Sequence, residues 1–198
     1  MGQKIMISAI LLAAGESKRM VDENKLIKKY KSIPLIKHAV SNVLNSPIDE
    51  LIIVLGYQKK SIEKIIGENK KIKFIANPNF ESGIASSIKK GLDSLSKETE
   101  AFFICLGDMP NVNKEIYNQL INASFSNKDK EIFVPYYQER QANPILFSKK
   151  MKDEIQKIEG GFGAKKIIAD NEKKVFKLST QDKGVITDFN KINDFETK

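Results

Sequence analysis

The chain has 198 residues, 41% of them hydrophobic and 29% charged, and its 33 basic and 25 acidic residues give a formal net charge of +8. This length and composition predict a single globular domain over residues 1–198, and no segment approaches the roughly 20 apolar residues that a membrane helix needs. The basic surplus favours an anionic partner, but the lysines are spread along the chain and no aromatic-basic motif points to nucleic acid. We therefore expect a soluble, cytoplasmic protein without a membrane or nucleic-acid partner.

Up to about residue 130, apolar strands alternate with helices. Strands are expected at residues 5–12, 51–55, 72–76 and 101–106, and helices at 35–44, at 61–66 behind a Ser61 cap, at 84–95 and at 116–121. Continuous apolar strands separated by helices imply a parallel sheet that is covered on both faces. The predicted fold class is α/β, a three-layer α/β/α sandwich with a Rossmann-like, mostly parallel sheet.

The pattern loosens after residue 130. Short strands are expected at residues 132–136, 144–147, 175–178 and 185–187, and a helix begins near Ser148. We interpret this part as an elaboration on one side of the sheet. Two single residues carry little chemistry: Cys105 lies inside an apolar strand, as a buried and inert thiol would, and His38 accompanies the apolar stripe of the first helix, where we expect a structural role.

The first loop is the most informative segment. An apolar run ends in Leu12-Ala13-Ala14-Gly15 and turns at once into a basic loop that contains Lys18 and Arg19. A small-residue turn after a strand exposes backbone N–H groups, which bind anions, and nearby positive charge strengthens that binding. Lys25 follows closely enough to reach the same ligand. A single glycine after a strand would be a plain turn, but the whole string predicts a site for phosphate.

Asp108 follows the most apolar strand, in the segment Gly107-Asp108-Met109-Pro110. Because ligands of open α/β sheets bind beyond the carboxyl ends of the strands, Asp108 is expected at the same edge as the first loop. A carboxylate beside phosphates is a natural Mg²⁺ ligand. The alternative is an aspartate that caps the following helix, but Asn113 is better placed for that role.

A third loop, residues 77–87, carries small and polar side chains. Gly83 lets the backbone approach a ligand closely. Ser86 and Ser87 open a helix with hydroxyl groups that would read the edge of a base, although ordinary capping explains either serine alone.

Taken together, these residues resemble the MobA-like nucleotidyltransferases, and within that group most closely the molybdenum cofactor cytidylyltransferases. Residues 12–20 match the family's opening string at each fixed position, and its Gly-Asp-Met-Pro motif stands unchanged at 107–110. Weaker similarities lie at 77–87, 144–147, 160–165 and 188–190. The resemblance implies the nucleotide-diphospho-sugar transferase type of fold, with a nucleotide-binding half at 1–125 and an acceptor-binding half at 126–198.

The resemblance also implies a role for each matching residue. The implied catalytic residues are Arg19, Lys25 and Asp108. Nucleotide binding falls to Leu12, Ala13, Ala14, Gly15, Glu16, Ser17, Asn77, Gly83, Ser86, Ser87 and Gly107. Acceptor binding falls to Asn143, Pro144, Gly160 and Gly163. Mg²⁺ is the implied cofactor, held by Asp108 with Asn190 or Asp188.

In the family, alanine at the position of Ala14 accompanies CTP and glycine accompanies GTP, so CTP is the implied donor. The implied reaction transfers CMP to a phosphate-ended acceptor, molybdopterin, with a molybdoenzyme or its chaperone as a further partner. The chain departs from the family pattern at Ala142, at Gly161 and around Asn190. The alternatives are a guanylyltransferase, an enzyme acting on a sugar or polyol phosphate, and a non-catalytic nucleotide-binding module that delivers a cofactor.

Overall fold

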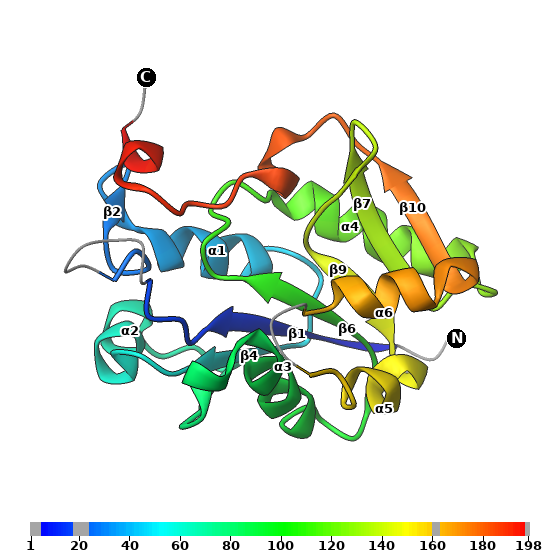
Figure 1. The fold of residues 1–198 in the computed structure, drawn as a ribbon, viewed down its shortest axis with the longest axis horizontal. Coiled ribbons are helices and arrows are strands. Elements are labelled where there is room, and N and C mark those ends of the chain that lie inside the picture. The colour runs from blue at the N-terminus through cyan, green and yellow to red at the C-terminus, as the bar shows by residue number, and fades with distance from the viewer. Residues whose placement is uncertain (1–4, 18–23, 160–162, 197–198) are drawn as a thin grey trace.

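The computed structural model describes residues 5–17, 24–159 and 163–196. Their main feature is one large mixed sheet (Figure 1). Its order is β10-β7-β9-β6-β1-β4-β5, and β8 pairs with β7. The strands are β1 (Met6–Ala13), β4 (Glu50–Leu55), β5 (Ile72–Ala76), β6 (Thr99–Leu106), β7 (Ile132–Tyr137), β8 (Arg140–Gln141), β9 (Ile145–Ser148) and β10 (Val175–Ser179). Strands β5, β4, β1 and β6 are parallel, whereas β9 runs antiparallel to both β6 and β7. The prediction of a mostly parallel sheet is confirmed.

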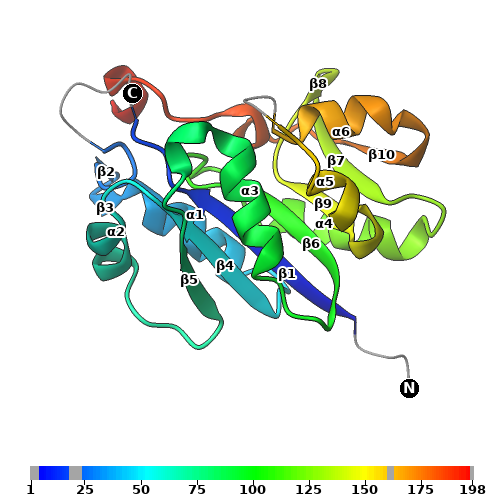
Figure 2. The same cartoon turned by 60° about the horizontal axis from the view of Figure 1, so that its bottom comes forward.

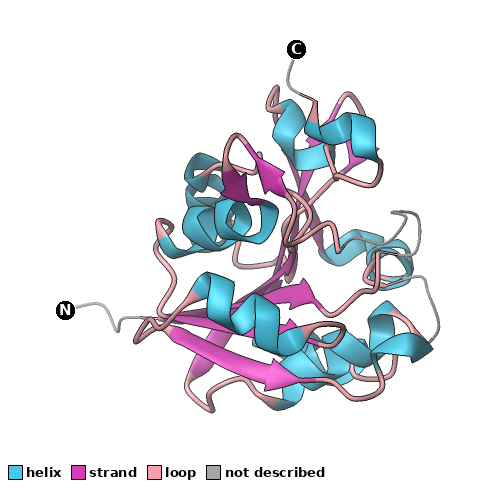
Figure 3. Cartoon of the chain, turned by 90° about the vertical axis from the view of Figure 1, so that its left-hand side faces the viewer, coloured by secondary structure: helices cyan, strands magenta, loops and turns pink. Residues whose placement is uncertain are grey.

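Helices cover both faces of the sheet (Figures 2 and 3). One face carries α1 (Leu35–Leu44), α2 (Lys59–Ile66) and α4 (Lys114–Ser126). The other carries α3 (Ile84–Asp93), α5 (Lys152–Ile155) and α6 (Lys165–Asp170). This is the predicted three-layer sandwich. No helix within the described ranges is long and apolar enough to cross a membrane.

The alternation of side chains along the central strands explains the two layers of core. In β1, Ala9 and Leu11 join the cluster under α1, while Ile10 joins the cluster under α3. Both clusters are apolar because successive side chains of a strand point to opposite faces. A central parallel strand is therefore apolar on both faces, and in β1 the buried polar exception is Ser8, whose hydroxyl lies 2.8 Å from that of Thr99.

The register of the central strands sets the edge at which the site lies. Leu12 of β1 lies opposite Leu106 of β6, and Ala13 lies opposite Leu55 of β4. These three strands end together, so the turns that follow them meet. The Gly107 N–H donates to the carbonyl oxygen of Leu12 at 3.0 Å and ties two of the turns to each other.

A short hairpin and the C-terminal segment lie side by side at one end of the molecule (Figure 1). The hairpin is β2 (Lys29–Tyr30) with β3 (Ile33–Pro34). The buried Phe189 packs edge-on against Tyr30, with ring centroids 4.8 Å apart. The 3₁₀ helices are η1 (Phe80–Ser82), η2 (Lys149–Met151), η3 (Glu172–Lys174), η4 (Lys183–Ile186) and η5 (Ile192–Phe195).

The structure corrects two predictions. The segment 185–187 is not a strand, because the Asp182 carboxylate accepts the Gly184 N–H at 2.8 Å and winds residues 183–186 into η4. Helix α2 begins at Lys59 behind Gln58, so the expected Ser61 cap is wrong. The expected Asn113 cap of α4 is confirmed, since its side chain accepts the Ile116 N–H at 3.2 Å.

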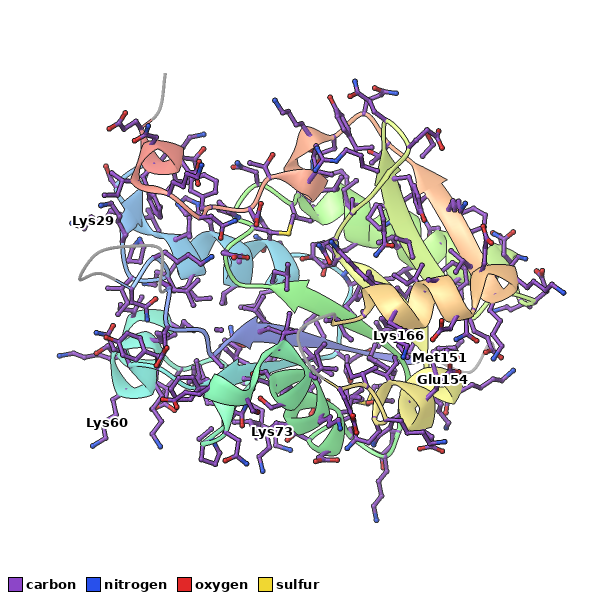
Figure 4. The ribbon with its side chains drawn as sticks, viewed as in Figure 1. Lys29, Lys60, Lys73, Met151, Glu154 and Lys166 are labelled. Carbon is purple, nitrogen blue, oxygen red and sulfur yellow. The ribbon has the colours of Figure 1, made fainter. Side chains whose placement is uncertain are left out.

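The basic surplus is distributed over the surface. The labelled side chains of Lys29, Lys60, Lys73 and Lys166 come from β2, α2, β5 and α6 and lie on different parts of the molecule (Figure 4). This distribution agrees with the even spread of lysines along the sequence.

Candidate functional site

A cleft of about 400 Å³ opens where the turns after β1 and β6 meet the start of α3. Its walls combine small residues with larger apolar and polar side chains. They are Leu12, Ala13, Ala14, Gly15, Ser17, Lys25, Leu26, Phe80, Gly83, Ile84, Ser87, Leu106, Asp108 and Asn190. The first loop and Asp108 therefore lie at the same edge of the sheet, as the sequence predicted.

Three side chains from distant parts of the chain converge in this cleft. The Nζ atom of Lys25 lies 2.5 Å from Oδ2 of Asp108 and donates to Oδ1 of Asn190 at 2.9 Å. The Lys25 and Asp108 side chains are only 15% and 19% exposed. Low exposure limits screening by water, so the charge of each group acts strongly on whatever binds beside it.

Main-chain contacts hold these three side chains in place. The Lys25 N–H donates to Oγ of Ser17 at 3.2 Å, which fastens the lysine to the turn after β1. The Phe189 N–H donates to the carbonyl oxygen of Asp108 at 2.9 Å, which brings Asn190 to the cleft. The anchors come from the main chain, so the Lys25 side chain is able to move while its backbone stays fixed.

Asp194 shapes the loop that carries Asn190. Its Oδ2 atom accepts the N–H groups of Asn190 and Lys191 at 2.6 and 2.7 Å. The hydrogen bond from Asn190 is the largest influence that lowers the pKa of Asp194, and the charges of Lys191 and Lys25 act in the same direction. No sequence pattern points to this residue, because its role depends on a turn of the backbone.

A buried amide orients the serines at the start of α3. Nδ2 of Asn77 donates to Oγ of Ser86 at 2.9 Å and to Oγ of Ser87 at 3.0 Å. The Ser86 hydroxyl also lies 2.8 Å from the carbonyl oxygen of Gly83, which takes up its hydrogen. Ser87 lines the cleft, and its Oγ atom acts as an acceptor in the bond from Asn77.

A second cavity of about 280 Å³ adjoins the cleft and shares the walls Ile84 and Leu106 with it. Its lining is mainly apolar, with two amides and one ammonium group. The residues are Ile84, Ile88, Ile104, Leu106, Gln141, Ala142, Asn143, Ile145, Gly163, Ala164 and Lys165. Each cavity takes residues from both halves of the chain, since Asn190 lines the first and Ile88 and Ile104 line the second.

Several predicted site residues lie away from both cavity linings. Glu16, Asn77, Ser86, Gly107 and Pro144 are among these, as is the exposed Asp188, whose carboxylate accepts from Nδ2 of Asn190. Asn77 and Gly107 act behind the walls, through the hydrogen bonds described above.

Arg19 and Gly160 lie outside the described residues, so their predicted roles stay predictions. Phe80 lines the cleft and was missed. No local pattern in the sequence points to it, because its place depends on packing against Gly56, where a Cβ atom would lie 2.6 Å from the Phe80 ring.

The donor set fits a divalent ion bound together with a nucleotide. Asp108 and Asn190 offer two oxygen atoms, and the described residues contain no cluster of three or more His, Cys, Asp or Glu side chains that would hold a metal alone. Mg²⁺ prefers oxygen ligands and commonly takes one or two from protein and the rest from phosphates and water.

Cys105 and His38 take no part in the cleft. Burial raises the pKa of the Cys105 thiol to about 12, so this thiol is inert. His38 is half-buried, and its Nε2 atom lies 2.8 Å from the carbonyl oxygen of Tyr30.

Comparison with solved structures places this fold among the nucleotidyltransferases. A nucleotidyl transferase from Methanothermobacter superimposes with a TM-score of 0.83 at 16% identity, over 97% of this chain and 95% of that one. The complex of Rv0371c from Mycobacterium tuberculosis with manganese superimposes with a TM-score of 0.73 at 18% identity, over 90% and 89%. The class that the fold defines is therefore the nucleotidyltransferase fold.

The sequence comparisons define the family. Residues 9–175 match the MobA-like NTP transferase domain, and the chain belongs to this family. It is 29% identical over 156 residues to a protein named probable molybdenum cofactor guanylyltransferase from Methanosarcina mazei, covering 76% of this chain and 67% of that protein. It is 26% identical over 143 residues to the molybdenum cofactor cytidylyltransferase of Escherichia coli, covering 72% and 70%.

Proposed function

We propose that this nucleotidyltransferase transfers CMP from CTP to the phosphate of molybdopterin and releases pyrophosphate, with Mg²⁺ as cofactor. One observation carries the proposal: Lys25, Asp108 and Asn190 meet within 2.5–2.9 Å beside the anion-binding turn after β1. A cation, a carboxylate and an amide oxygen at such a turn are the groups that a nucleoside triphosphate with its metal ion needs.

Asp108 and Asn190 would hold the metal ion. Mg²⁺, when bound, neutralises charge on the phosphates of the nucleotide. The manganese complex of the mycobacterial structural neighbour supports a divalent cation in proteins of this fold. Asn190 is preferred to Asp188 here, because Asn190 lines the cleft and Asp188 does not.

In the proposed reaction, an oxygen of the acceptor phosphate attacks the α-phosphorus of CTP. A new P–O bond forms, the bond from the α-phosphorus to the oxygen bridging to the β-phosphate breaks, and pyrophosphate leaves with the electron pair. The acceptor oxygen is already an anion, so the site needs no strong general base. Lys25 stabilises the charge that develops on pyrophosphate, and positioning by the turn supplies much of the remaining rate enhancement.

The part of the cleft around Ser87, where we propose that the base of the nucleotide binds, supports CTP as the donor. Ser87 accepts from Asn77 and therefore offers its own hydrogen to the ligand, and cytosine presents two adjacent acceptors, O2 and N3. The wall beside it is tight, because Ala14 and Phe80 both pack against Gly56. The methyl group of Ala14 reduces the room for a purine. The relatives named above include both a guanylyltransferase and a cytidylyltransferase, so GTP is the competing donor.

The adjoining cavity supports a planar heteroaromatic acceptor. Its walls are mainly aliphatic side chains, and its polar groups are the amides of Gln141 and Asn143 and the ammonium of Lys165. A flat ring system packs against apolar walls and pairs its edge with a few polar groups. A sugar or polyol phosphate has a hydroxyl on nearly every carbon, and most of these would lose their hydrogen bonds with water in such a cavity.

The deciding experiment incubates the protein with Mg²⁺, molybdopterin and each of CTP, GTP, ATP and UTP, and identifies the product by mass spectrometry. The cytidine dinucleotide form of the cofactor is the expected product. If the guanosine dinucleotide form appears instead, the donor is GTP and not CTP. If the protein transfers the nucleotide to sugar or polyol phosphates but not to molybdopterin, the proposed acceptor is wrong. If nucleotides bind but no mixture releases pyrophosphate, a non-catalytic delivery module is favoured.

A further inference from the structure

The ammonium group of Lys25 contacts one oxygen atom of each side chain that would hold the metal ion of the proposed function. Its Nζ atom lies 2.5 Å from Oδ2 of Asp108 and 2.9 Å from Oδ1 of Asn190. The ammonium cation therefore lies between these two oxygens.

The charge of this centre is balanced. Lys25 and Asp108 form a neutral ion pair, and Asn190 contributes a neutral amide. The two nearby carboxylates are directed to other groups: Asp188 accepts from the Asn190 amide, and Asp194 accepts from backbone N–H groups. The Lys25 ammonium therefore offsets the negative charge of Asp108, the carboxylate on which a divalent ion would bind.

Lys25 and a divalent ion compete for the same position. Mg²⁺ lies about 2.0–2.1 Å from its oxygen ligands, so an ion on Asp108 and Asn190 would overlap the volume of the ammonium group. The two cations also repel each other, and the low exposure of Lys25 and Asp108 leaves this repulsion poorly screened. The ammonium has to leave before the ion is able to enter.

The fold allows the Lys25 ammonium group a second position, away from Asp108. Its backbone N–H is held by Ser17 in the anion-binding turn, so the side chain starts beside the place where phosphates would bind. Lysine carries its charge on a flexible four-carbon stem. Its Nζ atom is able to swing from Asp108 to a phosphate oxygen without moving the backbone.

We propose that Lys25 holds the metal position in the free protein, and that the divalent ion binds tightly only together with a nucleotide whose phosphates accept the Lys25 ammonium. The inference rests on the proposed function for the nature of the ligands. This role of Lys25 makes metal binding and nucleotide binding mutually dependent, because a coupling between two ligands is equal in both directions. A metal ion that arrives without a nucleotide then binds weakly in the cleft.

The test measures Mn²⁺ binding by the electron paramagnetic resonance signal of the free ion, with and without a CTP analogue that has a methylene bridge between the α- and β-phosphates. The variants are Lys25→Met and, as a matched control, Lys29→Met, whose side chain is exposed on β2. We expect Lys25→Met to bind Mn²⁺ alone at least about tenfold more tightly than the wild type. Lys29→Met should match the wild type, and the analogue should increase Mn²⁺ affinity less in Lys25→Met than in either.

Unchanged or weaker binding of Mn²⁺ alone by Lys25→Met overturns the proposal. Lys25→Gln provides the same measurement if the methionine variant does not fold. Adding Asp108→Asn to Lys25→Met has to remove the gain, and a gain that persists in the double variant overturns the proposal because the ion is then bound elsewhere. Failure of the proposed function is a separate result, namely no transfer from any nucleotide by the wild type, and it leaves the Mn²⁺ measurement readable.

Discussion

The Phe189 N–H donates a hydrogen bond to the carbonyl oxygen of Asp108 at 2.9 Å, across 81 positions of the chain. This bond joins the C-terminal segment to the turn after β6. It places Asn190, the next residue, beside Lys25 and Asp108. The cleft is therefore completed by a segment that belongs to neither of the strands that form its floor.

Replacing Asp108 by alanine should lower the rate of pyrophosphate release by about 100-fold or more, because under the proposed function the site then loses a metal ligand and a group that organises charge. Steady-state kinetics with CTP, Mg²⁺ and acceptor measure this. Asp129→Ala is the control, since that aspartate is 75% exposed and distant in sequence from the cleft residues. Equal rates for Asp108→Ala and wild type would remove Asp108 from the catalytic machinery.

The pKa of Asp194 lies below its ordinary value, chiefly because its carboxylate accepts the Asn190 N–H. An acid whose pKa is lower in the folded state adds stability above the pKa of the unfolded chain, and this contribution is lost as pH falls through the lower, folded pKa. Urea unfolding between about pH 5 and about pH 3 should therefore show a steeper loss of stability for the wild type than for Asp194→Asn. Parallel curves would show that the two backbone hydrogen bonds contribute nothing.

Gly56→Ala should destabilise the protein by about 1–3 kcal/mol, the usual cost of an added group in a packed position. The new Cβ atom would lie 2.6 Å from the Ala14 oxygen and from the Phe80 ring. Thermal or urea unfolding measures the loss. Gly15→Ala is the matched control, because a Cβ atom there meets nothing within 4 Å, and a similar loss in both variants would contradict the packing argument.

Ser87→Ala should weaken CTP binding by about tenfold, the effect expected for one hydrogen bond at a poorly hydrated site. Ser86→Ala is the control, since Ser86 lies outside the cleft lining and already bonds to the Gly83 carbonyl oxygen. Isothermal titration with CTP distinguishes them. The assignment of Ser87 to the base fails if the two variants bind CTP equally well.

Lys165→Met should raise the KM for the acceptor by about tenfold and leave the KM for CTP unchanged, because Lys165 lines the second cavity and its loss removes one charged hydrogen bond. Lys166→Met tests whether any exposed lysine of α6 has the same effect. Lys166, labelled in Figure 4, is the next residue in the chain, and it is not part of that lining. A change confined to CTP would place Lys165 at the nucleotide instead.

The main strands and helices from β1 to α4 were predictable because each carries a local signal, whereas the short β2–β3 hairpin and the 3₁₀ helix η1 in the same part of the chain were not predicted. Buried parallel strands have to be apolar on both faces, and Asn113 has the side chain that a helix start requires. The less regular part was harder. The 185–187 segment has the composition of a strand, but the Asp182 side chain bonds to the backbone and turns the chain.

The sequence by itself determined the layered α/β fold, the small-residue turn at residues 12–17 that we propose binds phosphate, and the family to which the chain is similar, because these depend on periodicity and on short contiguous strings. Tertiary structure alone decided that Asn190 rather than Asp188 meets Lys25, that Phe80 lines the cleft and that Asp194 holds the loop. Such contacts join segments far apart in the chain. The positions of Asn190 and Asp194 follow from how the C-terminal segment packs against Tyr30, and that of Phe80 from its packing against Gly56, neither of which a local pattern records.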